Sequence, residues 1–101
     1  MRAPPQDEDP ALRLAALRSE IDRVDEALVA LLADRRAVVQ RMRALKEAHG
    51  LPRLDAAREA RMRASLEAAA RARDVPIALL HAVLDAILAD SRALVSSDPH
   101  E

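Results

Sequence analysis

The strongest constraint on the fold is the segment from about Leu12 to His49, which contains neither glycine nor proline. Its apolar residues recur at alternating spacings of three and four, the pattern of an α-helix that packs lengthwise against a partner. These residues are Leu14, Leu17, Ile21, Val24, Leu28, Leu31, Val38, Met42 and Leu45. We call this row the apolar stripe, and we predict that it lies on one long helix.

This helix is too long for one chain of 101 residues to enclose. At ~1.5 Å per residue the segment is roughly 55 Å long, whereas a compact domain of about 100 residues has a radius of gyration of ~13 Å. Apolar surfaces of such extent are rarely left bare on soluble monomers. We therefore expect a second chain to cover the apolar stripe.

Composition indicates an all-α protein and excludes several classes of function. Half of the residues are hydrophobic, one is glycine and none is aromatic, while Ala, Leu and Arg dominate. The formal net charge of −1 and the lack of aromatic side chains argue against nucleic acid and membrane partners. Cysteine is absent, which excludes thiol and disulfide chemistry. The first ten residues lack the apolar run of a signal peptide, so we expect a cytoplasmic protein.

Acidic residues, glycine and proline divide the chain. We expect residues 1–9 to form a flexible arm, residues 10–96 a single helical domain, and residues 97–101 a loose tail. Asp9 suits the N-cap of the first helix. Gly50 is placed to end that helix in a left-handed conformation.

Two shorter helices are predicted after the first. One covers about Asp55 to Arg73, and the other covers about Pro76 to Ser96. The sequence Asp-Val-Pro at 74–76 separates them, because proline disfavours a helical residue before it and suits a first turn. The connection before the second helix is short, so that helix turns back against its neighbour.

Cations interrupt or flank the apolar stripe. Arg35 occupies a position where the spacing requires an apolar residue, and Lys46 lies on nearly the same face, roughly 16 Å further along the axis. Two such side chains are able to hold a small dianion between them. The alternatives are a salt bridge or a solvated head group for Arg35, and a helix-end cation favoured by the dipole for Lys46.

Arg18 lies roughly 25 Å before Arg35 on the same helix and points about 100° away from it. The two guanidinium groups of one chain therefore do not grip one small ligand. If both serve one site, Arg18 comes from a second chain. The alternative is a surface cation that pairs with Asp22 or Asp25.

The remaining polar candidates have ordinary structural alternatives. Asp55 stands at an N-cap position, and Arg58 and Glu59 are charges of a first turn. Ser91 interrupts the apolar row of the third helix, where its hydroxyl is able to bond back to its own backbone. The three histidines are not spaced as metal ligands, and no Gly-rich phosphate loop or nucleophile arrangement is present.

The run from Leu17 to Arg36 reads L-R-x-x-I-D-x-x-D-x-x-L-x-x-L-L-A-x-R-R. It resembles the first helix of the all-helical chorismate mutases, the AroQ class. The resemblance continues through Lys46, through the sequence PRLDAARE at 52–59, and into Asp-Ser at 90–91. It covers nearly the whole chain, and on it the chain is identified as a monofunctional member of that class.

The resemblance implies three helices per chain in an intertwined homodimer with two equivalent sites. Arg18 of the partner subunit and Arg35 would bind the two carboxylates of the substrate. Lys46 would reach a carboxylate and the ether oxygen. These three residues would be the catalytic set.

Four further residues are implied to bind the substrate. Asp55 and Glu59 would meet the ring hydroxyl side, and Arg58 and Ser91 would help to hold the carboxylates. The implied reaction is the pericyclic rearrangement of chorismate to prephenate in aromatic amino acid biosynthesis. It needs no nucleophile, metal or cofactor, and we expect none.

One position departs from the family. One turn after Ser91, many members place a Gln or Glu that hydrogen-bonds the ether oxygen, and this chain has Val95. This predicts a slow enzyme, an enzyme improved by an activating partner enzyme, or a related activity. The related activities are 4-amino-4-deoxychorismate mutase and isochorismate pyruvate lyase, and a non-catalytic helical dimerisation module is a further alternative.

Overall fold

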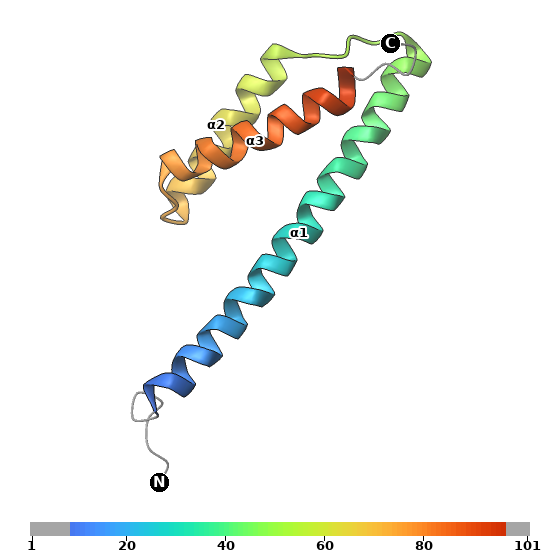
Figure 1. Ribbon diagram of the computed structural model, residues 1–101. Helices are drawn as coiled ribbons and strands as arrows, with labels where there is room; N and C mark the ends of the chain where they lie inside the picture. The colour runs from blue at the N-terminus through green and yellow to red at the C-terminus, as the bar shows by residue number, and fades with distance from the viewer. Residues whose placement is uncertain (1–8, 97–101) are drawn as a thin grey trace. The chain divides into compact units, whose positions relative to one another are not determined.

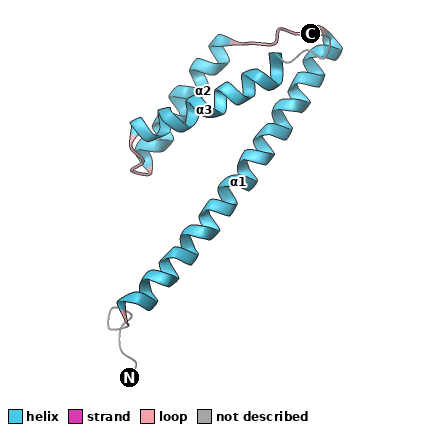
Figure 2. Ribbon diagram, viewed as in Figure 1, coloured by secondary structure: helices cyan, strands magenta, loops and turns pink. Residues whose placement is uncertain are grey.

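The computed structural model describes residues 9–96 (Figure 1). They form three helices, α1 (Pro10–His49), α2 (Ala56–Ala72) and α3 (Ile77–Ser96). Within this part of the chain every residue is helix, turn or loop and none is strand (Figure 2), which confirms the predicted all-α class. The expected arm, apart from Asp9, and the expected tail lie outside the described residues.

The first helix begins and ends where the sequence predicts. The Asp9 carboxylate accepts a hydrogen bond from the Ala11 N–H at 3.0 Å, so it acts as the N-cap. Gly50 follows the helix with φ +62°, the left-handed conformation that glycine adopts without strain. The Leu51 N–H then donates to the Lys46 carbonyl at 2.9 Å, which closes the helix end with a Schellman-type bond.

The ends of α2 are also set by local hydrogen bonds. Asp55 is the N-cap, and its carboxylate accepts the Arg58 N–H at 2.9 Å. At the other end, Asp74 adopts φ +56° and the Val75 N–H donates to the Ala70 carbonyl at 2.8 Å. An aspartate thus serves as the left-handed residue that glycine supplies at the end of α1.

The described residues fall into two compact units, one ending at Arg35 and the other beginning at Arg36. In the first unit, the apolar stripe residues from Leu14 to Leu31 are between 46% and 65% exposed. Each is a large hydrophobic side chain that the single chain leaves in contact with water. The first unit therefore carries an uncovered apolar face.

In the second unit, α2 and α3 pack side by side (Figure 1). Its core is small and is built from the buried side chains Val39, Ala70, Leu84, Leu88 and Val95. Since none of them is aromatic, each removes a modest apolar area from water. No helix within residues 9–96 has the length and apolar character needed to cross a membrane.

Ion pairs tie α3 to the other helices of the second unit. Arg36 of α1 pairs with Asp90 at 3.0 Å, and Arg63 of α2 pairs with Asp85 at 2.9 Å. Glu67 of α2 pairs with His81 at 2.6 Å. The hydrogen bond from His81 lowers the pKa of the Glu67 carboxyl, and the charges of His81, Arg71 and Arg63 act in the same direction.

Candidate active site

The two units divide the predicted site residues. The first unit contains Arg18 and Arg35, and the second contains Lys46, Asp55, Arg58, Glu59 and Ser91. Within the first unit, α1 is unbroken from Pro10, so its rise keeps Arg18 roughly 25 Å from Arg35 along the axis. Arg18 is exposed and Arg35 is half-buried.

Lys46 is half-buried near the C-terminal end of α1. Its Nζ donates to the Arg53 carbonyl at 3.0 Å and so ties the connection between α1 and α2 to the end of α1. An ammonium group has three donors, so this bond leaves capacity for a ligand. The last turn of a helix also favours a cation through its dipole.

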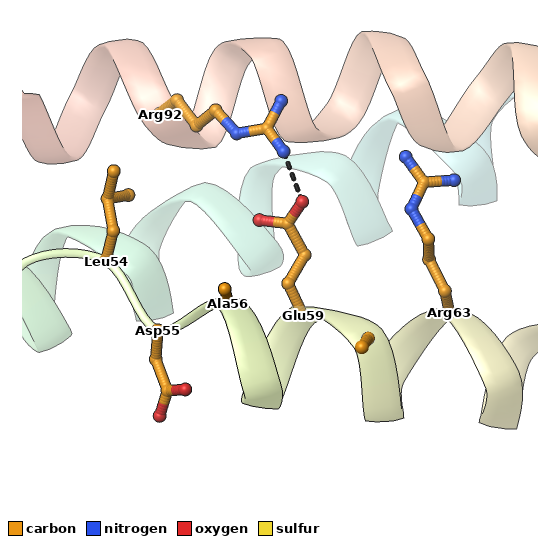
Figure 3. A pocket seen from close by; sticks show the side chains of 7 residues that line it. Leu54, Asp55, Ala56, Glu59, Arg63 and Arg92 are labelled. Atoms are coloured by element: carbon orange, nitrogen blue, oxygen red, sulfur yellow. Dashed lines mark hydrogen bonds and ion pairs between the residues drawn. The ribbon is translucent and has the colours of Figure 1, made fainter.

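A pocket of about 350 Å³ lies in the second unit between the start of α2 and the end of α3 (Figure 3). Its volume falls at the small end of the range of ligand sites, about 300–1,000 Å³. Its lining combines small or apolar side chains with four charged ones. The lining residues are Leu54, Asp55, Ala56, Glu59, Ala60, Arg63 and Arg92.

The two acidic residues of this pocket point in different directions. Glu59 extends from α2 toward α3 and forms an ion pair with Arg92, whereas the Asp55 side chain turns away from that pair (Figure 3). The Asp55 carboxylate is engaged with the Arg58 N–H as the cap of α2. The structure thus gives Asp55 the capping role that the sequence left open as its alternative.

Arg92 is one of two pocket arginines, with Arg63, that were not predicted from the sequence. It stands next to Ser91, but nothing in the local sequence distinguishes it from the other exposed arginines. Its contact with Glu59 depends on how α2 and α3 are aligned, because the two residues are far apart in the chain. The Arg92 side chain is 49% exposed and the Glu59 side chain is 29% exposed, so the ion pair is partly shielded from water.

Ser91 and Arg58 do not line this pocket. The Ser91 hydroxyl donates to the Ile87 carbonyl at 3.0 Å, the back-bonded arrangement that the sequence offered as its alternative. The Arg58 side chain is exposed at the start of α2. The pocket therefore brings together two of the predicted substrate-binding residues, Asp55 and Glu59, with two arginines that were not predicted, Arg63 and Arg92.

Val95 lies one turn after Ser91 and is 8% exposed. It belongs to the core of the second unit, where a valine side chain contributes packing and no hydrogen-bond donor. The departure from the family pattern is therefore accommodated as part of the hydrophobic core.

Fold and site together define an all-helical protein with a charged pocket between two of its helices. Comparison with known proteins gives the family. The sequence profile of the family chorismate mutase type II matches residues 17–95, and this chain belongs to that family. This match confirms the resemblance to the chorismate mutases that the sequence motifs indicated.

One relative supports the same assignment. The chain is 42% identical over 78 residues to a T-protein of Enterobacter agglomerans. The aligned region covers 77% of this chain and 21% of the T-protein, so the chain corresponds to about a fifth of that relative. No solved structure matches this chain significantly.

Proposed function

We propose that this chain is a chorismate mutase that converts chorismate to prephenate. The observation that carries the proposal is the family match over residues 17–95, which includes every predicted site residue from Arg18 to Ser91. The reaction is intramolecular, so the protein has no group to transfer. Its task is to hold the folded conformer of the substrate and to stabilise charge in the transition state.

In this proposal cations perform both tasks. Arg35 binds one carboxylate of the substrate and so fixes one end of the reacting conformer. Lys46 reaches a carboxylate and the ether oxygen, on which negative charge grows as the carbon–oxygen bond breaks. An ammonium group aimed at that oxygen lowers the barrier, and it does so more strongly where water is excluded.

We further propose that the active form is a homodimer in which Arg18 of the partner subunit binds the second carboxylate. Two observations support this. The separation of Arg18 from Arg35 along one helix is too large for one small ligand. The apolar stripe from Leu14 to Leu31 is exposed in the single chain, and burying it between two chains would supply the driving force for assembly.

The burial of Val95 favours a second candidate function, that of a slow chorismate mutase or of an enzyme that acts on a related substrate. A missing donor at a developing oxyanion costs about 2.7–4 kcal/mol, or ~10²–10³ in rate. An activating partner enzyme would be one source of the missing stabilisation. Comparing rates with chorismate, 4-amino-4-deoxychorismate and isochorismate separates these possibilities.

The proposal is tested by measuring prephenate formation by the purified chain, together with Arg35→Ala and Lys46→Ala. Both variants should lose most of the activity, because each removes a charge that contacts the substrate. The matched control is Arg41→Ala, which removes an exposed arginine of the same helix. A folded dimer that forms no prephenate at millimolar chorismate would defeat the proposal.

Binding provides an independent measurement. A bicyclic dicarboxylate that resembles the transition state should raise the melting temperature, since a ligand of the native state stabilises it by about 2.7 kcal/mol at 100 times its Kd. A cytoplasmic location remains a prediction, and cell fractionation would check it.

A further inference from the structure

The carboxylate of Glu59 is the negative group that reaches from α2 toward α3 in the pocket, and it is held by a guanidinium. Arg92 forms the ion pair with it, and Arg63 projects from α2 on the same side (Figure 3). Asp85 raises the pKa of Arg63 most strongly through a hydrogen bond, and the charge of Glu59 also contributes. Glu59 therefore lies in a setting where positive charge already compensates it.

This compensation changes what the carboxylate is able to bind. A neutral hydroxyl donates one hydrogen bond and accepts others, so it fits between a carboxylate and a guanidinium. A protonated amine only donates, and its positive charge is repelled by a guanidinium a few ångströms away. A carboxylate without such a neighbour would favour the amine instead.

We propose that Arg92 is a specificity-determining residue. Its positive charge allows Glu59 to bind a ring hydroxyl of the substrate and repels a ring ammonium group. The inference rests on the proposed function and on the role that the family resemblance implies for Glu59, at the ring hydroxyl side of the substrate. It assigns the substrate to the hydroxyl-bearing cyclohexadiene dicarboxylates rather than to their amino analogues. Asp55 does not offset this preference, because its carboxylate turns away and caps α2 (Figure 3).

The test compares kcat/KM for chorismate with kcat/KM for 4-amino-4-deoxychorismate, using the purified full chain at neutral pH. The wild type should favour chorismate. Arg92→Ala should lower the chorismate-to-amine ratio by about tenfold, because it removes a like charge near the ammonium group at a partly exposed position. Arg92→Lys keeps the positive charge and should keep the preference for the hydroxyl.

The matched control is Glu67→Gln, which breaks another ion pair between α2 and α3 and does not line the pocket. It should leave the ratio unchanged, which separates a general loss of helix packing from a change in recognition. Arg92→Gln supplies the neutral variant if the alanine variant does not fold.

The possible outcomes distinguish the inference from the proposed function. Equal slowing of both reactions by the neutral Arg92 variants, with an active wild type, overturns the inference alone. A wild type that prefers the amine also overturns it. A folded wild type that converts neither compound overturns the proposed function and this inference with it.

Discussion

Replacing Val95 with glutamine should raise the rate of the proposed reaction and lower the stability of the fold. Val95 is 8% exposed and lies one turn after Ser91 on α3. A donor aimed at a developing oxyanion is worth about 2.7–4 kcal/mol, or ~10²–10³ in kcat. We expect Val95→Gln to recover part of this, an increase in kcat of up to about 10².

The expected loss of stability follows from the same burial. Val95 packs in a core that also contains Leu84 and Leu88, which are 3% and 5% exposed. Placing an amide in such surroundings without a full set of partners costs about 1–3 kcal/mol. For a domain of this size each kcal/mol lowers the melting temperature by roughly 4–8 °C.

The assay measures kcat for prephenate formation and the melting temperature of the wild type, Val95→Gln and Val95→Met. Methionine has nearly the length of glutamine but offers no donor, so it controls for the change of shape. The glutamine variant should be faster than the methionine variant and no more stable. Equal kcat values for these two folded variants would refute the reasoning, because the gain would not depend on a hydrogen bond.

Three further predictions concern assembly and stability. Ile21→Asp should convert the proposed dimer into a monomer, because this residue of the apolar stripe is 59% exposed in the single chain. Light scattering would measure the mass, and a dimer of unchanged affinity would contradict the proposed interface. Gly50→Ala should lower the free energy of unfolding by about 1 kcal/mol in urea titration, because φ is +62°. An added Cβ meets nothing within 4 Å, so this loss comes from the backbone conformation alone. An unchanged urea midpoint would be inconsistent with this. The Glu67→Gln variant should lose less stability on acidification than the wild type does. His81 holds the pKa of Glu67 below its usual 4.5, so the stabilisation is present above that pH and disappears as the pH falls through the lowered value. Melting curves from pH 6 to pH 3 should therefore converge for wild type and variant, and a constant difference would argue against the bond.

The helix boundaries and the separation of the cations follow from the sequence alone. Asp9, Gly50 and Asp55 mark helix ends through hydrogen bonds and backbone conformations that involve residues within one or two turns. The rise of a helix fixes how far Arg18 lies from Arg35 along the first helix. Family membership was also readable, because the motif depends on the order and spacing of residues.

The content of the pocket was decided by tertiary structure. Whether Glu59 meets Arg92 depends on the register of α2 against α3, and no local pattern specifies that register. The same packing buries Val95. The sequence alone showed only that Val95 differs from the Gln or Glu that many family members have at this position. Local signals act through the backbone of neighbouring residues, whereas contacts between helices depend on how whole apolar faces fit together, and for that reason only the folded structure gives them.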